Sequence, residues 1–139
     1  MYSISKKISI GKQVSIAKNS FINDEIYPSV EIRFSCCNCG YENSVVIKPY
    51  ESGFPIFQIY DENKILSKNE MLENKLVSET SYNANYLGEL TVNNLATLYF
   101  GSDCVSCQSK YIGVFSFGEK QPGLEILTVS GIWNYDEVE

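Results

Sequence analysis

Two short cysteine motifs determine how this chain is expected to fold. Residues 36–40 read Cys-Cys-Asn-Cys-Gly, and residues 104–107 read Cys-Val-Ser-Cys. Each motif contains a C-x-x-C pair, whose two thiolates can bind one metal ion from a single tight loop. Gly40 can adopt a positive φ that turns backbone N–H groups toward the sulfur atoms, whereas Gln108 occupies the equivalent place after the second motif. The sequence therefore predicts one structural zinc ion, bound by Cys36, Cys39, Cys104 and Cys107.

Strand-like segments flank both cysteine motifs. Apolar and polar residues alternate from Val30 to Cys36, which is typical of a strand with one buried face. A second apolar run, residues 44–48, follows the first motif. Residues 97–100 and 111–117 flank the second motif in the same way and are rich in aromatic and β-branched side chains. Each motif is therefore expected to lie at the tip of an antiparallel β-hairpin.

Both ends of the chain also show strand periodicity. The isoleucine and valine residues between positions 4 and 16 all fall on even numbers, and we expect this strand to bend at Gly11-Lys12. Residues 124–135 predict a closing strand with a bulge at Ser130-Gly131. The remaining expectations are a connection over residues 19–28, a short apolar strand over 56–60, a surface loop over 78–88 and a turn-rich loop over 118–123.

One segment carries a clear helix signal. Ser67 and Glu70 form an S-x-x-E capping box, and Leu66 and Met71 have the spacing of a hydrophobic staple. We predict a helix over residues 68–77. The predicted fold is mostly β, of the β-rich α+β kind. It consists of antiparallel hairpins holding one structural zinc ion, with one short helix in the insertion between the two motifs.

Length and charge limit the possible partners. The 139 residues predict a single zinc-stabilised β-rich domain over residues 1–139. The net charge is −6 and the eleven basic residues are spread along the chain, which argues against nucleic acid and favours a basic protein partner.

No apolar run is long enough to cross a membrane, and the first residues do not resemble a secretory signal. We therefore expect a cytoplasmic protein, in which C-x-x-C pairs bind metal more often than they form disulfides.

The sequence contains no recognisable catalytic constellation. It has no histidine, which removes the commonest general base and every Ser-His or Cys-His pair. A zinc ion held by four thiolates has no open position for a catalytic water. No carboxylate pair and no phosphate-binding glycine loop can be singled out. We predict that the protein is not an enzyme and has no catalytic or cofactor-binding residues apart from the metal ligands.

The two motifs resemble those of the zinc ribbons, in which two hairpins each contribute a C-x-x-C pair to one Zn²⁺. The matching positions are Cys36, Cys39, Gly40, Cys104 and Cys107. The resemblance implies four-cysteine coordination and, as in that family, a nucleic acid or a transcription or translation complex as partner. The sequence departs from the family pattern because residues 40–103 lie between the pairs, where zinc ribbons have a much shorter spacer.

The function is inferred by elimination. We expect a non-enzymatic protein-binding module, similar in character to the small acidic immunity proteins of bacteria that mask cationic toxins, although that similarity carries no motif. A zinc-ribbon protein that binds nucleic acid is the first alternative. A thiol or metal sensor that uses the fifth cysteine, Cys37, is the second. For the four paired cysteines, the alternatives to zinc are disulfides, free thiols or a redox pair.

Overall fold

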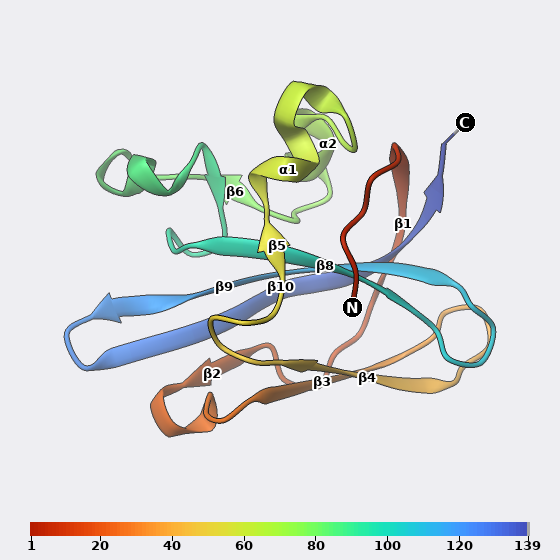
Figure 1. Ribbon diagram of the computed structural model, residues 1–139, viewed down its shortest axis with the longest axis horizontal. Helices are drawn as coiled ribbons and strands as arrows, with labels where there is room; N and C mark the ends of the chain where they lie inside the picture. The colour runs from red at the N-terminus through yellow and green to blue at the C-terminus, as the bar shows by residue number, and fades with distance from the viewer. Residues whose placement is uncertain (139) are drawn as a thin grey trace.

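A six-stranded antiparallel sheet lies at the centre of the computed structural model, which describes residues 1–138 (Figure 1). Its strand order is β1-β10-β9-β8-β5, with β2 also paired to β10. The prediction of a mostly β fold is confirmed. The strands of this sheet are β1 (Ile8–Val14), β2 (Ser20–Ile22), β5 (Phe54–Pro55), β8 (Thr97–Asp103), β9 (Lys110–Gln121) and β10 (Leu124–Glu137). The other elements are β3 (Val30–Ser35), β4 (Glu42–Ile47), β6 (Ser78–Glu79), β7 (Leu90–Thr91), helices α1 (Phe57–Tyr60) and α2 (Lys68–Glu73), and 3-10 turns η1 (Asn23–Glu25), η2 (Asp61–Asn63) and η3 (Tyr82–Leu87).

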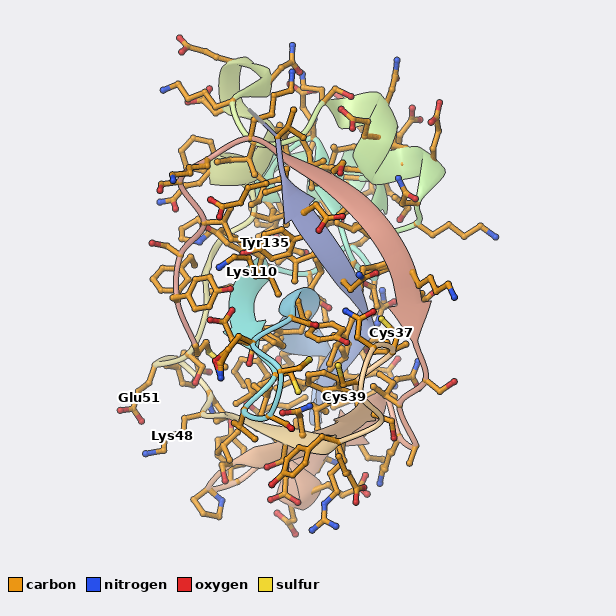
Figure 2. All side chains as sticks on the ribbon, turned by 90° about the vertical axis from the view of Figure 1, so that its right-hand side faces the viewer. Cys37, Cys39, Lys48, Glu51, Lys110 and Tyr135 are labelled. Carbon is orange, nitrogen blue, oxygen red and sulfur yellow. The ribbon has the colours of Figure 1, made fainter. Side chains whose placement is uncertain are left out.

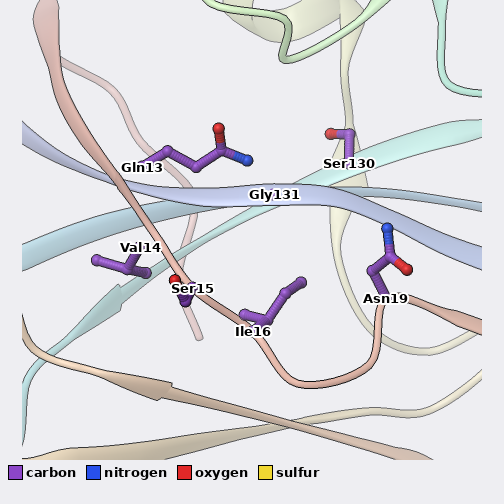
Figure 3. Close-up of a pocket in the computed structure, with 7 residues that line it drawn as sticks. All are labelled: Gln13, Val14, Ser15, Ile16, Asn19, Ser130 and Gly131. Atoms are coloured by element: carbon purple, nitrogen blue, oxygen red, sulfur yellow. The ribbon is translucent and has the colours of Figure 1, made fainter.

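Strand β10 organises the sheet because it pairs with three other strands. Strand β9 lies along one side of β10, while β1 and β2 share its other side. The register between β9 and β10 shifts between Val129 and Gly131, which confirms the predicted bulge. Strand β1 is likewise irregular between Ile10 and Gln13, at the predicted bend. The chain leaves the sheet between β1 and β2, beside the bulge, and a shallow polar pocket opens there (Figure 3).

Two further layers cover the two faces of the central sheet (Figure 1). The β3–β4 hairpin covers one face, and we call it the hairpin layer. The segment from α1 to β7 covers the other face, and we call it the insertion layer. Strand β9 is buried at seven consecutive positions because both of its faces are covered. The lone tryptophan, Trp133, is buried in the core beneath the insertion layer.

Helix α2 begins as the sequence predicts. The Ser67 hydroxyl accepts a hydrogen bond from the backbone N–H of Glu70 at 3.1 Å, and the Glu70 carboxylate accepts one from the N–H of Ser67 at 3.1 Å. Leu66 and Met71 are fully buried, as expected for a staple. The helix ends at Glu73, earlier than predicted, because Lys75 has a φ of 61° that no right-handed helix can accommodate.

Several predicted loop and strand assignments are wrong in detail. Residues 56–60 were expected to form a strand but contain helix α1. The prediction failed because a short apolar run is equally consistent with a strand and with a buried helix. Strands β9 and β10 continue through most of the expected loop at 118–123 and leave only a tight turn at Pro122-Gly123. The expected loop at 78–88 contains β6 and η3, and the connection at 19–28 contains β2 and η1.

Candidate metal centre

Both C-x-x-C motifs form the same backbone turn, which we call a knuckle. In the first knuckle, residues 36–41, the Gly40 N–H donates to the Cys36 carbonyl at 2.9 Å and the Cys36 N–H donates to the Tyr41 carbonyl at 2.9 Å. The second knuckle, residues 104–109, repeats both bonds from its own equivalent residues at 2.9 and 2.8 Å. Gly40 has a φ of 76°, and Gln108 adopts almost the same angle, 67°. The second knuckle therefore keeps the turn without the glycine that favours it.

The two knuckles bring the four predicted ligands together. All four sulfur atoms lie within 4.8 Å of one another. Cys36 Sγ lies 3.5 Å from Cys107 Sγ, and Cys39 Sγ lies 3.6 Å from Cys104 Sγ. A regular tetrahedron of sulfurs around Zn²⁺, with Zn–S of about 2.3 Å, has edges of about 3.8 Å. A disulfide needs a separation of about 2.05 Å, so none of the cysteines is disulfide-bonded. The cluster can hold one tetrahedral metal ion.

The cluster joins the hairpin layer to the central sheet. One cysteine pair follows β3 and the other follows β8, so the four ligands come from two different sheets. The tips of the two hairpins meet at one end of the molecule, where Cys37 and Cys39 lie close together in Figure 2. Cys36 and Cys104, the first ligand of each knuckle, are buried, whereas Cys39 and Cys107 are exposed. A metal ion bound there would link two layers that are distant in sequence.

Tyr111 supports the first knuckle from the central sheet. Its hydroxyl donates to Cys36 Sγ at 3.1 Å and accepts a hydrogen bond from the Cys37 N–H at 2.9 Å. The ring is fully buried and packs against Phe34 of β3, with ring centroids 4.8 Å apart. Burial raises the pKa of Tyr111, and the hydrogen bonds to Cys36 and Cys37 raise it further. Its hydroxyl therefore stays protonated and remains a donor. Tyr111 thereby fixes the position of a sulfur of the cluster, which is the role that outer-shell partners have in metal sites.

Asn43 connects the hairpin layer to the second knuckle. Its side-chain N–H donates to Cys104 Sγ at 3.4 Å and to the Tyr41 carbonyl at 3.1 Å. Its carbonyl oxygen accepts a hydrogen bond from the Val105 N–H at 3.1 Å. Asn43 is one of few buried polar residues, and these contacts satisfy its amide. A further bridge, 2.6 Å long, joins Asn38 of the first knuckle to the hydroxyl of Ser109 in the second.

Sequence reasoning did not single out Tyr111 or Asn43 as parts of the site. A signal for Asn43 was present, because it shares the inward-facing positions of β4 with Val45 and Ile47. A polar residue in an inward-facing series indicates a specific buried partner. Tyr111 carries no such signal, since a tyrosine at the start of a strand is ordinary and only the fold brings its hydroxyl to Cys36.

The thiols of the cluster differ in their tendency to ionise. Burial opposes ionisation of Cys36, but hydrogen bonds from Tyr111 and from the N–H groups of Cys39 and Asn38 lower its pKa to about 5. The pKa of Cys104 is also lowered, by backbone N–H groups and Asn43, against the effect of burial.

Cys39 shows the opposite shift. The hydrogen bond from the Tyr41 backbone lowers the pKa of its thiol, but partial loss of hydration and the three neighbouring sulfurs together raise it to about 11. Four thiolates at this spacing repel one another, and a divalent cation would remove that repulsion. The site is therefore suited to a cation that displaces protons from the thiols.

Cys37 lies outside the cluster, in agreement with its expected position. It is exposed, and its sulfur lies 3.4 Å from the Tyr111 hydroxyl. It is not among the four residues whose sulfurs converge. Cys37 therefore supplies no ligand in this arrangement.

No protein-family model matches the chain, and comparisons with curated proteins and with solved structures found no match. The similarity to zinc ribbons therefore rests on the two knuckles and the convergence of their cysteines. Among residues 1–138, no helix has both the length and the apolar character needed to cross a membrane.

Proposed function

We propose that the four cysteines bind one structural Zn²⁺ and that the chain is a non-enzymatic protein-binding module. The observation that carries the metal assignment is the convergence of four sulfurs from the tips of two hairpins. A tetrahedral set of four thiolates is typical of zinc or an iron–sulfur cluster, and four sulfurs within 4.8 Å of one another enclose space for a single ion. The closed thiolate shell favours a structural role.

The surface supports binding to another protein. Tyr82 and Tyr86 each have more than four-fifths of their surface exposed, although tyrosine is a large, half-apolar side chain. Aromatic residues are enriched at the centres of protein interfaces. The net charge of −6 favours a basic partner. A cationic toxin that the chain would mask, as immunity proteins do, is a partner of this kind.

The basic side chains give little support to nucleic-acid binding. Lys18 is paired with Glu25, and Arg33 with Glu31, so both cations are partly neutralised on the surface. Nucleic-acid affinity arises mainly from cations that are free to contact phosphates. The nucleic-acid alternative therefore stands behind protein binding in this proposal.

Native mass spectrometry tests the metal assignment. We expect one zinc ion per chain in the wild-type protein and in Cys37→Ser, and none in Cys39→Ser. The Cys37→Ser variant is the matched control, because it removes a neighbouring thiol that lies outside the cluster. Wild-type protein without metal, or loss of zinc from Cys37→Ser, would contradict the assignment. Iron in place of zinc, with the absorbance of an iron–sulfur cluster, would contradict it as well.

A further inference from the structure

The insertion layer carries a groove on its surface. Two adjoining depressions, of about 570 and 380 Å³, share Lys68, Gly88 and Glu89 and together form what we call the insertion groove. The groove lies between helix α1 with η2, helix α2, and the segment from β6 to β7. These elements belong to the layer on the face of the sheet opposite the β3–β4 hairpin (Figure 1). The insertion groove is therefore separate from the cysteine cluster.

Exposed aromatic rings line or flank the insertion groove. Phe57 and Tyr82 line it and are 52% and 88% exposed. Tyr86, one turn after Tyr82 in η3, is 81% exposed. Exposed rings that lie close together form an apolar surface that a partner can cover. The groove thus offers apolar contacts to an incoming chain.

The groove is also acidic. Four carboxylates line it, and Lys68 is the one cation among its lining residues. Two of the carboxylates, Asp61 and Glu79, make no ion pair with any residue among 1–138. The lining carboxylates are those of Asp61, Glu62, Glu79 and Glu89.

Lys68 shows which ligand chemistry the groove accommodates. Its ammonium group donates to a Glu89 carboxylate oxygen at 2.8 Å and lies 5.8 Å from the centre of the Tyr60 ring. A carboxylate and an aromatic face together favour a cation at this position. The groove therefore already binds one lysine side chain, which comes from the chain itself, and it has unpaired carboxylates for others.

We infer that the insertion groove docks a basic segment of a partner protein. Lysine or arginine side chains of the partner would pair with Asp61 and Glu79, and their aliphatic portions would cover Tyr82 and Phe57. The inference rests on the proposed protein-binding function and names the surface that performs it. Nucleic acid does not fit this groove, because four carboxylates repel phosphates.

Calorimetric titration with a defined probe tests the inference. The probe is a synthetic peptide in which arginine and lysine alternate with leucine, and a peptide with glutamate in place of the basic residues is its counterpart. We expect the basic peptide alone to bind, with an affinity that falls as salt rises. The double variant Asp61→Asn/Glu79→Gln should weaken binding about ten-fold.

Matched variants separate local contacts from general charge. Asp24→Asn/Glu119→Gln removes two exposed carboxylates outside the insertion that form no ion pair within residues 1–138, and it should change affinity less than about two-fold. Tyr82→Ala should weaken binding about five-fold or more, whereas Tyr50→Ala, which truncates an equally exposed ring elsewhere, should not. Circular dichroism of each variant verifies that it is folded.

The outcomes distinguish the inference from the proposed function. If the basic peptide binds and the groove variants behave like their controls, the docking site lies elsewhere and the inference is overturned, while the proposed function stands. If neither peptide binds the wild-type protein, the preference for a basic partner is wrong and the inference fails with it. Binding of both peptides with equal affinity would show that charge does not select the partner and would also overturn the inference.

Discussion

The two layers that cover the central sheet are attached to it in different ways. The insertion layer is joined by main-chain bonds: the Ile8 N–H donates to the Ile65 carbonyl at 3.1 Å, and strand β5, which leads directly into the layer, pairs with β8. Within residues 1–138, the hairpin layer has one backbone bridge to the rest of the fold, between Ile16 and Phe34. It relies instead on apolar contacts along its length and on the cysteine cluster at its tip. Metal binding should therefore matter much more to one layer than to the other.

Replacement of a metal ligand tests this difference most strongly. Cys104→Ser should lower the free energy of unfolding by about 5 kcal/mol or more, because structural zinc contributes on the order of 10–16 kcal/mol of apparent binding energy in small peptides. Such a loss is comparable to the net stability of most domains. Urea unfolding followed by circular dichroism measures it. Amide hydrogen exchange should show that β3 and β4 lose protection before α2 does.

Ser106→Ala, in the same knuckle, is the control for Cys104→Ser and should leave stability nearly unchanged, since Ser106 is exposed. Chelation of the wild-type protein should reproduce the effect of the ligand variant. A chelated protein that keeps a cooperative transition close to that of the metal-bound form would show that the hairpin layer does not depend on the cluster.

Removal of the Tyr111 hydroxyl should lower metal affinity and stability but leave the four cysteines able to bind the ion. Tyr111→Phe keeps the buried ring but deletes the donor to Cys36, so we expect a loss of about 1–3 kcal/mol in stability and 10- to 100-fold in metal affinity. A chelator competition assay measures the affinity. Tyr41→Phe, which alters an exposed tyrosine in the same knuckle, should bind metal as the wild type does.

The same variant should change the pH at which metal is released. The pKa of Cys36 is depressed from 9.0 to about 5, so the stability it contributes is complete above pH 9 and is lost as pH falls through 5. Loss of the Tyr111 hydrogen bond raises the pKa of Cys36, so protons compete with the metal at higher pH. We expect the release midpoint of Tyr111→Phe to lie above that of the wild type, and an unchanged midpoint would contradict this account.

The insertion layer should respond to its helix cap and not to the metal site. Ser67→Ala removes the N-cap bond to Glu70 and should cost about 1 kcal/mol of stability. Metal affinity should stay at the wild-type value, because the cap belongs to the other layer. Ser81→Ala is the matched control, since Ser81 occupies the N-cap position of η3 without making a side-chain cap bond. A shift in metal affinity with Ser67→Ala would indicate that the two layers are coupled.

The smallest expected effect comes from the residue with a positive φ in each knuckle, which is Gly40 in the first and Gln108 in the second. Gln108→Gly relieves a left-handed backbone angle of 67° and should stabilise the protein by about 0.5 kcal/mol, because the greater freedom of glycine in the unfolded chain offsets part of the gain. The reciprocal Gly40→Gln should destabilise by a similar amount. A Cβ atom at position 40 would meet no atom within 4 Å, so the expected cost comes mainly from the backbone angle. Thermal unfolding of both variants would measure the pair.

Local sequence patterns predicted the parts of the fold that depend on neighbouring residues. The spacing of the cysteines anticipated their convergence, and the capping box located the start of α2. The alternation around Val30 and Phe34 predicted β3 because one face of that strand is buried. These features are set by the residues themselves, so they can be recognised without the fold.

The parts that depend on distant residues could not be predicted in this way. No local signal shows that β1 and β2 both pair with β10, or that one sheet is covered on both faces. The apolar run at 56–60 fits a strand and a helix equally well, and its packing within the insertion layer selects the helix. The roles of Tyr111 and Asn43 arise only when the hairpins meet, which explains why the cysteines were found and their supporting partners were not.

The pairing of β10 with β1 and β2 implies a delay in folding during synthesis. The ribosome releases both early strands, and the first knuckle with them, long before residues 124–137 exist. Cys39 precedes its neighbour Cys104 by 65 residues, so the nascent chain carries half of a metal site while its partner half is still untranslated. During that interval β1 and β2 expose unpaired backbone edges, which readily associate with other chains. The edges of β1 and β2 are therefore open to other chains for longer during synthesis than at any time after β10 has formed.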